Sequence, residues 1–271
     1  MDICPITPSI GAEVLGVDLA EAASDDGTIA VIEQAWIEHK VLVFRDQGHL
    51  TTEQHLDVCR RLGDLETHPF APPKPGYPEV LMIIANEQRR GNENTWHSDV
   101  TWRTEPSRGS MLRAIEVPEV GGDTLFADME AAYNGLAPEL QDRLAGLSAS
   151  HDLAGVAESI IGAEAAEGLR TTFPPSEHPV IRTHPQTGRR SIYVNAAFTT
   201  HIVGVDPTES EKLLQHLYAQ ATVPEYQFRL RWRPGTVALW DNRCVQHYAV
   251  SDYWPSTRLM ERVTIVGDRP R

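Results

Sequence analysis

Cysteine and long apolar runs are both scarce in this sequence. The three cysteines, Cys4, Cys59 and Cys244, are odd in number and widely scattered among 271 residues. This pattern argues against a disulfide framework and against a thiolate metal site. No stretch approaches the roughly 18 apolar residues that cross a membrane, and the first residues lack the charged and apolar segments of a secretion signal. We therefore expect a cytoplasmic protein.

Positive charge is also in short supply. Lysine and arginine number 24 against 38 aspartates and glutamates, which gives a formal net charge of −14. Such a chain repels phosphate backbones and anionic lipid, and no basic run offsets this repulsion locally. We expect neither a nucleic-acid nor a membrane partner.

Internal repeats, low-complexity tracts and long polar linkers are absent as well. The hydrophobic fraction of 41% is normal for a globular protein, and 271 residues can bury one core. The sequence therefore predicts a single domain spanning residues 1–271.

Short strand-like segments dominate the chain from Val80 onward. They include VLMII at 80–84, WHSDVTW at 96–102, TVALWDN at 236–242 and RVTIVGD at 262–268. Helical spacing is confined to 25–40, 51–62, 130–147 and 209–220, and the Ala-, Gly- and Glu-rich segment 153–175 is expected to be a mobile cover. This pattern predicts a mostly β fold with flanking helices, of the sandwich or jelly-roll kind.

The first chemical signal is the pair His97 and Asp99. Residues two apart on a strand point to the same face, so both side chains can bind one ion. Alone, the pair is more often a surface histidine beside an unrelated aspartate. Its aromatic and β-branched neighbours, however, make an uncompensated carboxylate unfavourable there.

His247 supplies a third ligand, 148 residues after Asp99 and directly after a strand that reads as buried. Two histidines and one carboxylate are the facial triad of non-haem iron(II) oxygenases, which leaves coordination positions open for substrates. A closed structural zinc site leaves none.

Several segments in order along the chain carry a family resemblance. They are GAEVLGVDL, LVFRDQ, WHSDVTW, VPEVGGDTLFADMEAAY, HPVIRTHPQTGRRSIYVN and WDNRCVQHYAVSDYWPSTRLMERVTIVGD. With these, nearly the whole chain resembles the TauD/TfdA group of Fe(II)- and 2-oxoglutarate-dependent dioxygenases. The resemblance implies a double-stranded β-helix, iron(II) as the metal, and 2-oxoglutarate and O₂ as co-substrates.

The resemblance also assigns the co-substrate contacts. Arg258, eleven residues after His247, matches the arginine that binds the distal carboxylate of 2-oxoglutarate, for which a planar guanidinium is well suited. Thr124 of GGDT matches a supporting hydroxyl donor. The alternative readings are a structural ion pair for Arg258 and an ordinary turn or strand hydroxyl for Thr124.

The implied reaction is hydroxylation of an organic substrate, coupled to oxidative decarboxylation of 2-oxoglutarate to succinate and CO₂. Val100, Trp102 and Phe198 are the expected walls of the substrate pocket, although aromatic residues of this kind are more often plain core. His68 and Arg262 match residues that hold a sulfonate in the taurine enzyme; a loop histidine and a sheet arginine are the alternatives. An anionic sulfonate, alkyl sulfate or carboxylate is expected.

Two positions depart from the taurine pattern. Ala71 stands where the taurine enzyme has an aromatic hydroxyl, and Glu93 lies in the polar stretch before WHSD. Taurine is therefore not the expected substrate. Hydroxylation beside a sulfonate, sulfate or ether oxygen would lead on to C–S or C–O cleavage.

Other classes of protein could use the same three metal ligands. A zinc hydrolase would need a general base that the motif does not identify, and a non-catalytic binding protein would have little reason to keep all three ligands and Arg258. A halogenase is disfavoured because Asp99 is present. The family often forms dimers or tetramers, so a homo-oligomer is expected.

Overall fold

The computed structural model describes residues 1–68, 73–91 and 93–271. Strands make up 31% of the chain and helices 28%, so the architecture is mixed rather than mostly β. The helices that the sequence did not predict lie largely in α6 (Ala154–Ile161) and α7 (Ala163–Thr172), within the segment expected to be a mobile cover. No helix among the described residues has both the length and the apolar character to cross a membrane.

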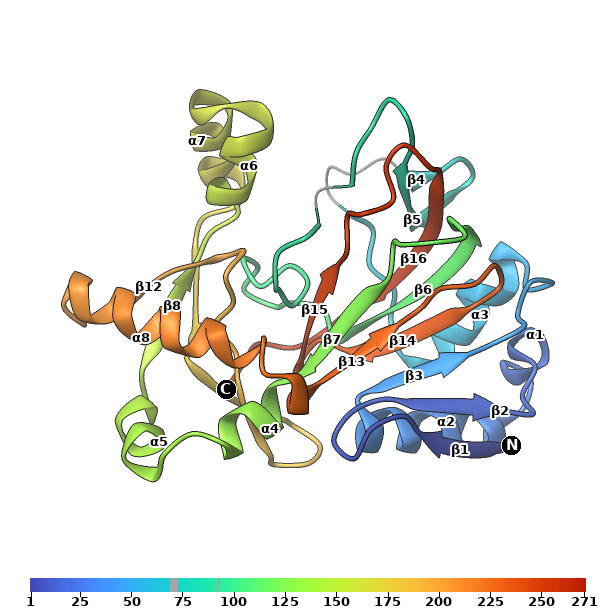
Figure 1. Ribbon diagram of the computed structural model, residues 1–271, viewed down its shortest axis with the longest axis horizontal. Helices are drawn as coiled ribbons and strands as arrows, with labels where there is room; N and C mark the ends of the chain where they lie inside the picture. Colours follow the sequence, from blue (N-terminus) through green and yellow to red (C-terminus); the bar gives the residue numbers. More distant parts are fainter. Residues whose placement is uncertain (69–72, 92) are drawn as a thin grey trace.

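An eight-stranded sheet lies on the right-hand side of the molecule in Figure 1. Adjacent strands in this sheet are antiparallel, except β2 and β3, which are parallel. Its order is β1 (Asp2–Pro5), β2 (Ala12–Leu15), β3 (Val41–Phe44), β14 (Val237–Asp241), β6 (Gly109–Glu116), β16 (Arg258–Ile265), β5 (Tyr77–Ala85) and β4 (Pro73–Lys74).

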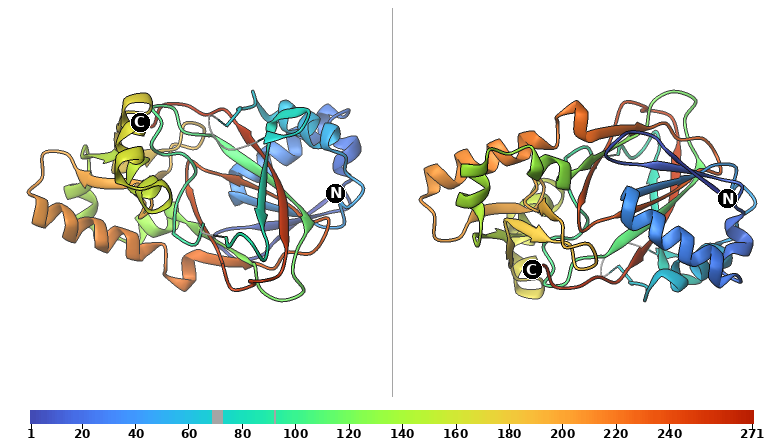
Figure 2. Two further views of the ribbon diagram at one scale, coloured as in Figure 1. Left: turned by 90° about the horizontal axis from the view of Figure 1, so that it is seen from above. Right: turned by 90° about the horizontal axis from the view of Figure 1, so that it is seen from below.

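Both faces of this sheet are covered by other elements. Accordingly, side chains that alternate along its central strands are buried on both faces. On β14, Val237 and Leu239 face one core, whereas Ala238 and Trp240 face another. The first core lies under helices α1 (Leu19–Ala22), α2 (Asp26–His39) and α3 (Thr52–Leu62), which Figure 2 shows on the outer side of the sheet.

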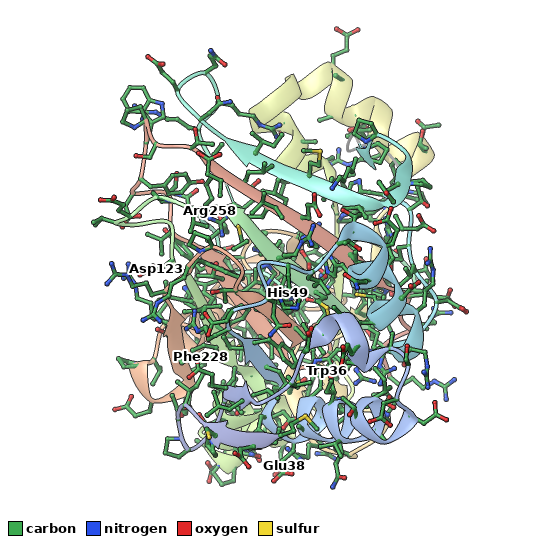
Figure 3. The ribbon with its side chains drawn as sticks, turned by 90° about the vertical axis from the view of Figure 1, so that its right-hand side faces the viewer. Trp36, Glu38, His49, Asp123, Phe228 and Arg258 are labelled. Carbon is green, nitrogen blue, oxygen red and sulfur yellow. The ribbon has the colours of Figure 1, made fainter. Side chains whose placement is uncertain are left out.

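A three-stranded sheet covers the opposite face. It consists of β13 (Gln227–Leu230), β7 (Thr124–Asp128) and β15 (Val245–Ala249), in that order. Phe228 of β13 therefore lies in the core between the sheets, whereas Trp36 of α2 lies in the core beneath the helices (Figure 3). The two sheets form the sandwich that the strand pattern predicted.

Helix α3 confirms the helix predicted at 51–62. Thr51 accepts a hydrogen bond from the backbone N–H of Gln54, whose side chain in turn accepts one from the N–H of Thr51, so the helix begins with a capping box. The helix ends at Leu62, before Gly63. Its buried face contains His55 and faces β16.

The rest of the chain builds a second region, at the left of Figure 1. The predicted helix 130–147 is wrong as a single element: it divides into α4 and α5, because Gly135 closes the first and Pro138 opens the second. The elements of this region are α4 (Met129–Asn134), α5 (Pro138–Leu144), β8 (Ser148–His151), α6, α7, β9 (Ser176–Pro179), β10 (Ile181–Thr183), β11 (Arg190–Ile192), β12 (Thr199–Ile202), α8 (Pro207–Gln220) and η1 (Pro224–Tyr226).

The predicted strand at 96–102 is also wrong. Only His97 pairs with a neighbour, through an isolated bridge to His247, and the chain turns from Asp99 onward. Val100 has φ 49°, a left-handed conformation that β-branched residues rarely adopt. The backbone is therefore strained one residue after a predicted ligand, where the turn sets the direction of the Asp99 side chain.

Candidate metal and co-substrate site

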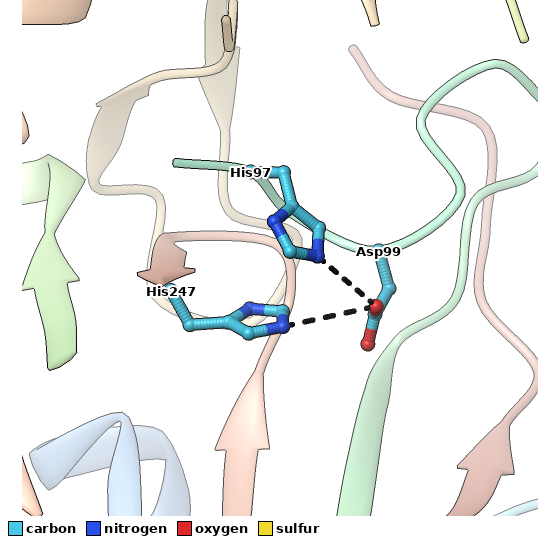
Figure 4. A group of neighbouring side chains, drawn as sticks. All are labelled: His97, Asp99 and His247. Atoms are coloured by element: carbon cyan, nitrogen blue, oxygen red, sulfur yellow. Dashed lines mark ion pairs between the residues drawn. The ribbon is translucent and has the colours of Figure 1, made fainter. Parts of the chain in front are cut away.

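His97, Asp99 and His247 meet at one point, as Figure 4 shows. The Nε2 atom of each histidine lies 3.9 Å from Oδ1 of Asp99. Two atoms that each lie ~2.1 Å from one ion can be at most about 4.2 Å apart, so these separations suit a single metal. The two backbones are joined directly: His97 N donates to His247 O at 3.1 Å, and His247 N to His97 O at 2.8 Å.

Neighbouring polar groups orient the ligands. Nδ1 of His97 lies 2.7 Å from the carbonyl oxygen of Thr95 and donates to it, which leaves the Nε2 lone pair facing the site. Oδ2 of Asp99 accepts from Ser110 Oγ at 3.0 Å and from Asn242 Nδ2 at 3.5 Å. Oδ1 therefore faces the two histidines.

Ser110 and Asn242 were not identified as site residues from the sequence. Asn242 also accepts a hydrogen bond from the backbone N–H of Asp99 at 3.2 Å and one from the Trp240 indole at 3.1 Å. Its place inside WDNR was a usable signal. Ser110, the second residue of β6, had none, because its contact depends on strand pairing.

The protonation states suit metal binding. Burial alone would raise the pKa of Asp99, but Arg262 and the two histidines outweigh it and hold that pKa well below its usual range. Burial, reinforced by His97, lowers the pKa of His247 to about 3. At neutral pH the carboxylate is therefore ionised and the His247 imidazole is neutral, as a metal requires.

Arg258 is buried without a charge partner. It is 5% exposed, its Nε has no hydrogen-bond partner, and no carboxylate of residues 1–68, 73–91 or 93–271 lies within ion-pair distance of it. Its guanidinium lies 5.8 Å from the centre of the Trp232 ring, and burial lowers its pKa. The alternative of a structural ion pair is thus not seen, and an anionic ligand would supply the missing charge.

A cavity joins Arg258 to the two proposed histidine ligands, His97 and His247. Arg258 and Arg262 are four residues apart on β16 and so lie on the same face of the sheet. Oγ1 of Thr124 accepts from the Trp232 indole at 2.9 Å, which leaves its hydroxyl proton for a ligand. The cavity is lined by Ile83, Glu93, His97, Leu112, Thr124, Phe126, Trp240, His247, Ala249, Arg258 and Arg262. The predicted co-substrate contacts and the histidine ligands therefore share one space.

Arg262 lies at the metal end of this cavity and donates to Oδ1 of Asp99 at 2.8 Å. His68 lies near it: burial, followed by the charges of Arg262 and Arg103, lowers the pKa of His68 to about 4. The prediction about Ala71 falls outside the described residues.

The three predicted pocket walls are less closely grouped. Val100, Trp102 and Phe198 belong to one apolar cluster. The Phe198 ring is 6.2 Å from the His97 ring, centre to centre, and lies beside the proposed metal site. Trp102 instead lines a separate cavity of about 420 Å³ with Phe173, whose ring centre is 5.0 Å away.

A second group of potential ligands, His184, Asp241 and Cys244, is already satisfied. Oδ1 of Asp241 accepts from Arg243 Nε at 2.8 Å, and Oδ2 accepts from Arg243 Nη2 at 2.6 Å. His184 Nε2 lies 3.1 Å from Oδ2. This cluster therefore braces the turn after β14, and we assign no metal to it.

The fold and the site suit a mononuclear metal enzyme, with a buried arginine in a cavity that reaches two of the potential metal ligands. Comparisons narrow the class. The family model described as taurine catabolism dioxygenase TauD, TfdA family, matches residues 2–264. The alpha-ketoglutarate-dependent sulfate ester dioxygenase of Pseudomonas putida is 35% identical and covers 100% of this chain and 91% of its own. The (S)-phenoxypropionate/alpha-ketoglutarate-dioxygenase of Sphingobium herbicidovorans is 36% identical, covering 98% and 95%.

Solved structures agree. A taurine dioxygenase from Burkholderia xenovorans has a TM-score of 0.86 and 36% identity, covering 99% of this chain and 90% of that one. A structure of AAD-2 in complex with Mn(II) and N-oxalylglycine has a TM-score of 0.86 and 29% identity, covering 99% and 98%. The chain belongs to the TauD/TfdA family of 2-oxoglutarate (alpha-ketoglutarate)-dependent non-haem iron dioxygenases, which use Fe(II) and 2-oxoglutarate.

Proposed function

We propose that this enzyme hydroxylates a small anionic organic substrate of the sulfonate, alkyl sulfate or aryloxy carboxylate class. The observation that carries the proposal is the pair of arginines on one face of β16. Arg258 lies buried in the cavity with no ion-pair partner among the described residues, and Arg262 lies beside Asp99. One arginine suits the dianionic co-substrate, and the other suits a substrate anion close to the metal. Relatives named for sulfate esters and for phenoxypropionate support the same class.

The residue roles follow from this arrangement. His97, Asp99 and His247 hold Fe(II), and bound iron with 2-oxoglutarate and O₂ supplies the oxidative decarboxylation to succinate and CO₂ and the hydroxylation of a C–H bond. Arg258 and Thr124 hold the distal carboxylate of 2-oxoglutarate.

On the substrate side, Arg262 and His68 fix the anion, so that the carbon beside it is presented to the metal. Phe198, which packs in one apolar cluster with Val100 and Trp102, excludes water from this end of the site. If that carbon carries sulfur or oxygen, the hydroxylated product is unstable. It would release sulfite, sulfate or an alcohol together with a carbonyl compound.

The remaining architectural proposals are a double-stranded β-helix, formed by the two facing sheets, and a single domain over residues 1–271. The likeness to solved dioxygenases across 99% of the chain supports both. The proposal that the protein forms a homo-oligomer, either a dimer or a tetramer, rests on the family resemblance alone. Light scattering of the purified protein would test it.

One pair of measurements tests the function. Adding Fe(II) and 2-oxoglutarate without oxygen should give a weak visible charge-transfer band that Asp99→Ala abolishes. With oxygen, succinate should form in step with product when sulfonates, alkyl sulfates or aryloxy carboxylates are supplied. A band that survives in Asp99→Ala would overturn the metal assignment. A zinc hydrolase would act on sulfate esters without consuming 2-oxoglutarate, and a binding protein would form no product.

A further inference from the structure

A second, larger cavity opens from the proposed metal site. Its volume is about 880 Å³, within the range that accommodates ligands of drug size. It shares His97 and Glu93 with the co-substrate cavity, so the two meet at the metal end. It is lined by Arg89, Arg90, Glu93, Thr95, His97, Asp152, Gly155, Val156, Ala196, Ala197, Phe198, Thr199 and Thr200. The space is larger than a short alkyl sulfate or phenoxy acid requires.

Two adjacent arginines, Arg89 and Arg90, line this cavity from a loop that hydrogen bonds hold in place. Arg89 and Arg90 are exposed, and no carboxylate among the described residues pairs with either. The Arg90 guanidinium lies 4.2 Å from the centre of the Trp254 ring. Ser251 Oγ donates to Gly91 O at 2.7 Å and Trp254 Nε1 to Glu87 O at 3.3 Å, so both sides of the arginine pair are tied to the loop after β15.

Two acidic side chains, Asp152 and Glu93, also line the cavity. Asp152 pairs with Arg170 Nε at 2.7 Å, and its other oxygen accepts from the backbone N–H of Ala154. With Asp152 paired in this way, Arg89 and Arg90 outnumber Glu93. This end of the cavity is therefore positive, on a protein whose net charge is −14.

The length of the chain between Arg90 and His97 limits how far the arginine pair can lie from the proposed metal site. Residues 90 to 97 run from Arg90 to the ligand His97, and 97 − 90 = 7 residues extend at most about 25 Å. Arg262, beside Asp99, lines the co-substrate cavity, which meets the larger cavity at His97 and Glu93. One ligand of moderate length could therefore meet a cation at each end.

We propose that Arg89 and Arg90 form a second anion-binding subsite, and that the preferred substrates carry a second anionic group at the end remote from the reacting carbon. This rests on the proposed function, because Arg262 must hold the first anion. The class is an α,ω-dianion: a sulfate, sulfonate or carboxylate at both ends of an aliphatic or aryl body. Guanidinium groups suit all three anions.

Calorimetry on the Zn(II)- and 2-oxoglutarate-loaded protein tests this without turnover. Octyl sulfate is compared with octane-1,8-diyl disulfate, and phenoxyacetate with 4-carboxyphenoxyacetate. We expect the dianion to bind roughly five- to thirtyfold more tightly, beyond the twofold statistical advantage of the symmetric disulfate. The preference should shrink as salt is raised, and it should be lost in the double variant Arg89→Gln/Arg90→Gln.

The control is Arg231→Gln/Arg233→Gln, which removes the same charge from exposed positions outside the cavity lining. It should keep the preference. Equal binding of the mono- and dianions, or a preference that survives Arg89→Gln/Arg90→Gln, would overturn the subsite; so would no binding of any probe. Succinate formation by the iron-loaded enzyme tests the proposed function separately. If the dianion binds more tightly through the two arginines but no succinate forms, the subsite stands and the proposed function fails.

Discussion

Two buried arginines illustrate how similar residues can have opposite roles. Arg113 on β6 is 6% exposed and pairs with Glu261 at 2.6 Å. Arg258 on the neighbouring strand is 5% exposed and has no such partner among the residues that the structure describes. The charge of Arg113 is compensated within the fold, whereas we propose that a bound anion compensates the charge of Arg258. Removing Arg113 would leave a buried carboxylate short of a cation, whereas removing Arg258 would relieve the ligand-free protein of an uncompensated charge.

This contrast gives a prediction. Arg113→Met should lower the free energy of unfolding by about 3–5 kcal/mol, because Glu261 is left buried with one cation fewer. Arg258→Met should leave the ligand-free protein as stable as the wild type or more so. 2-Oxoglutarate with Zn(II) should raise the melting temperature of the wild type, but Arg258→Met should keep only the shift that Zn(II) produces alone. A large loss of stability in ligand-free Arg258→Met would show a structural partner instead.

At the scale of elements, the sequence predicted what local periodicity controls. Strand β14 alternates between two cores, and α3 has its cap and its apolar stripe, so both could be identified from the residues alone. The segment 96–102 could not. Its composition is strand-like, but the segment forms a turn. Asn242, which follows β14 in the sequence, accepts a hydrogen bond from the backbone N–H of Asp99 in this turn. Tertiary contacts decided the local structure there, at the site where strain was needed.

The site divides in the same way. Motif spacing and family resemblance were enough to predict His97, Asp99, His247 and Arg258 as site residues. Arg89 and the cavity beside it could not be predicted, because that space depends on how α6 and the 196–200 segment pack around it. Residue type alone does not show whether an arginine faces water or a ligand.

Helix α3 carries a testable pH effect through His55, which is fully buried. Burial, followed by the charge of Arg113, lowers the pKa of His55 to about 3, with Glu261 and Lys74 also facing it. Between about pH 6.5 and 3 the unfolded chain binds a proton that the folded protein excludes. Stability should therefore fall as the pH falls through this window, by up to about 1.4 kcal/mol per pH unit from this group.

Urea unfolding at several pH values between 5 and 7.5 measures this. His55→Leu should flatten the dependence of stability on pH relative to the wild type. Val58→Ala, on the same helix, should lower stability by a similar amount at every pH, because it removes no titratable group. A wild-type slope in His55→Leu would contradict the assignment.

At the scale of the whole molecule, the cores are joined by shared strands. On β7, Phe126 faces the core between the sheets, while the next residue, Ala127, faces the core of the second region. The chain after β16 returns to β10, where buried Arg182 donates to Asp268 at 2.8 Å. Thr183 N also donates to Arg271 O at 2.7 Å. Neither region can open without exposing atoms of the other.

Unfolding should accordingly be a single cooperative transition. Leu217→Ala, in α8 of the second region, and Leu56→Ala, beneath the large sheet, remove buried side chains from different cores. Each should lower the same transition by roughly 2–5 kcal/mol with an unchanged dependence on urea. Far-UV circular dichroism and tryptophan fluorescence should report coincident curves. If Leu217→Ala instead produced an early transition seen by only one of the two probes, the second region would be an independent unit, and the proposal of one domain over residues 1–271 would be wrong.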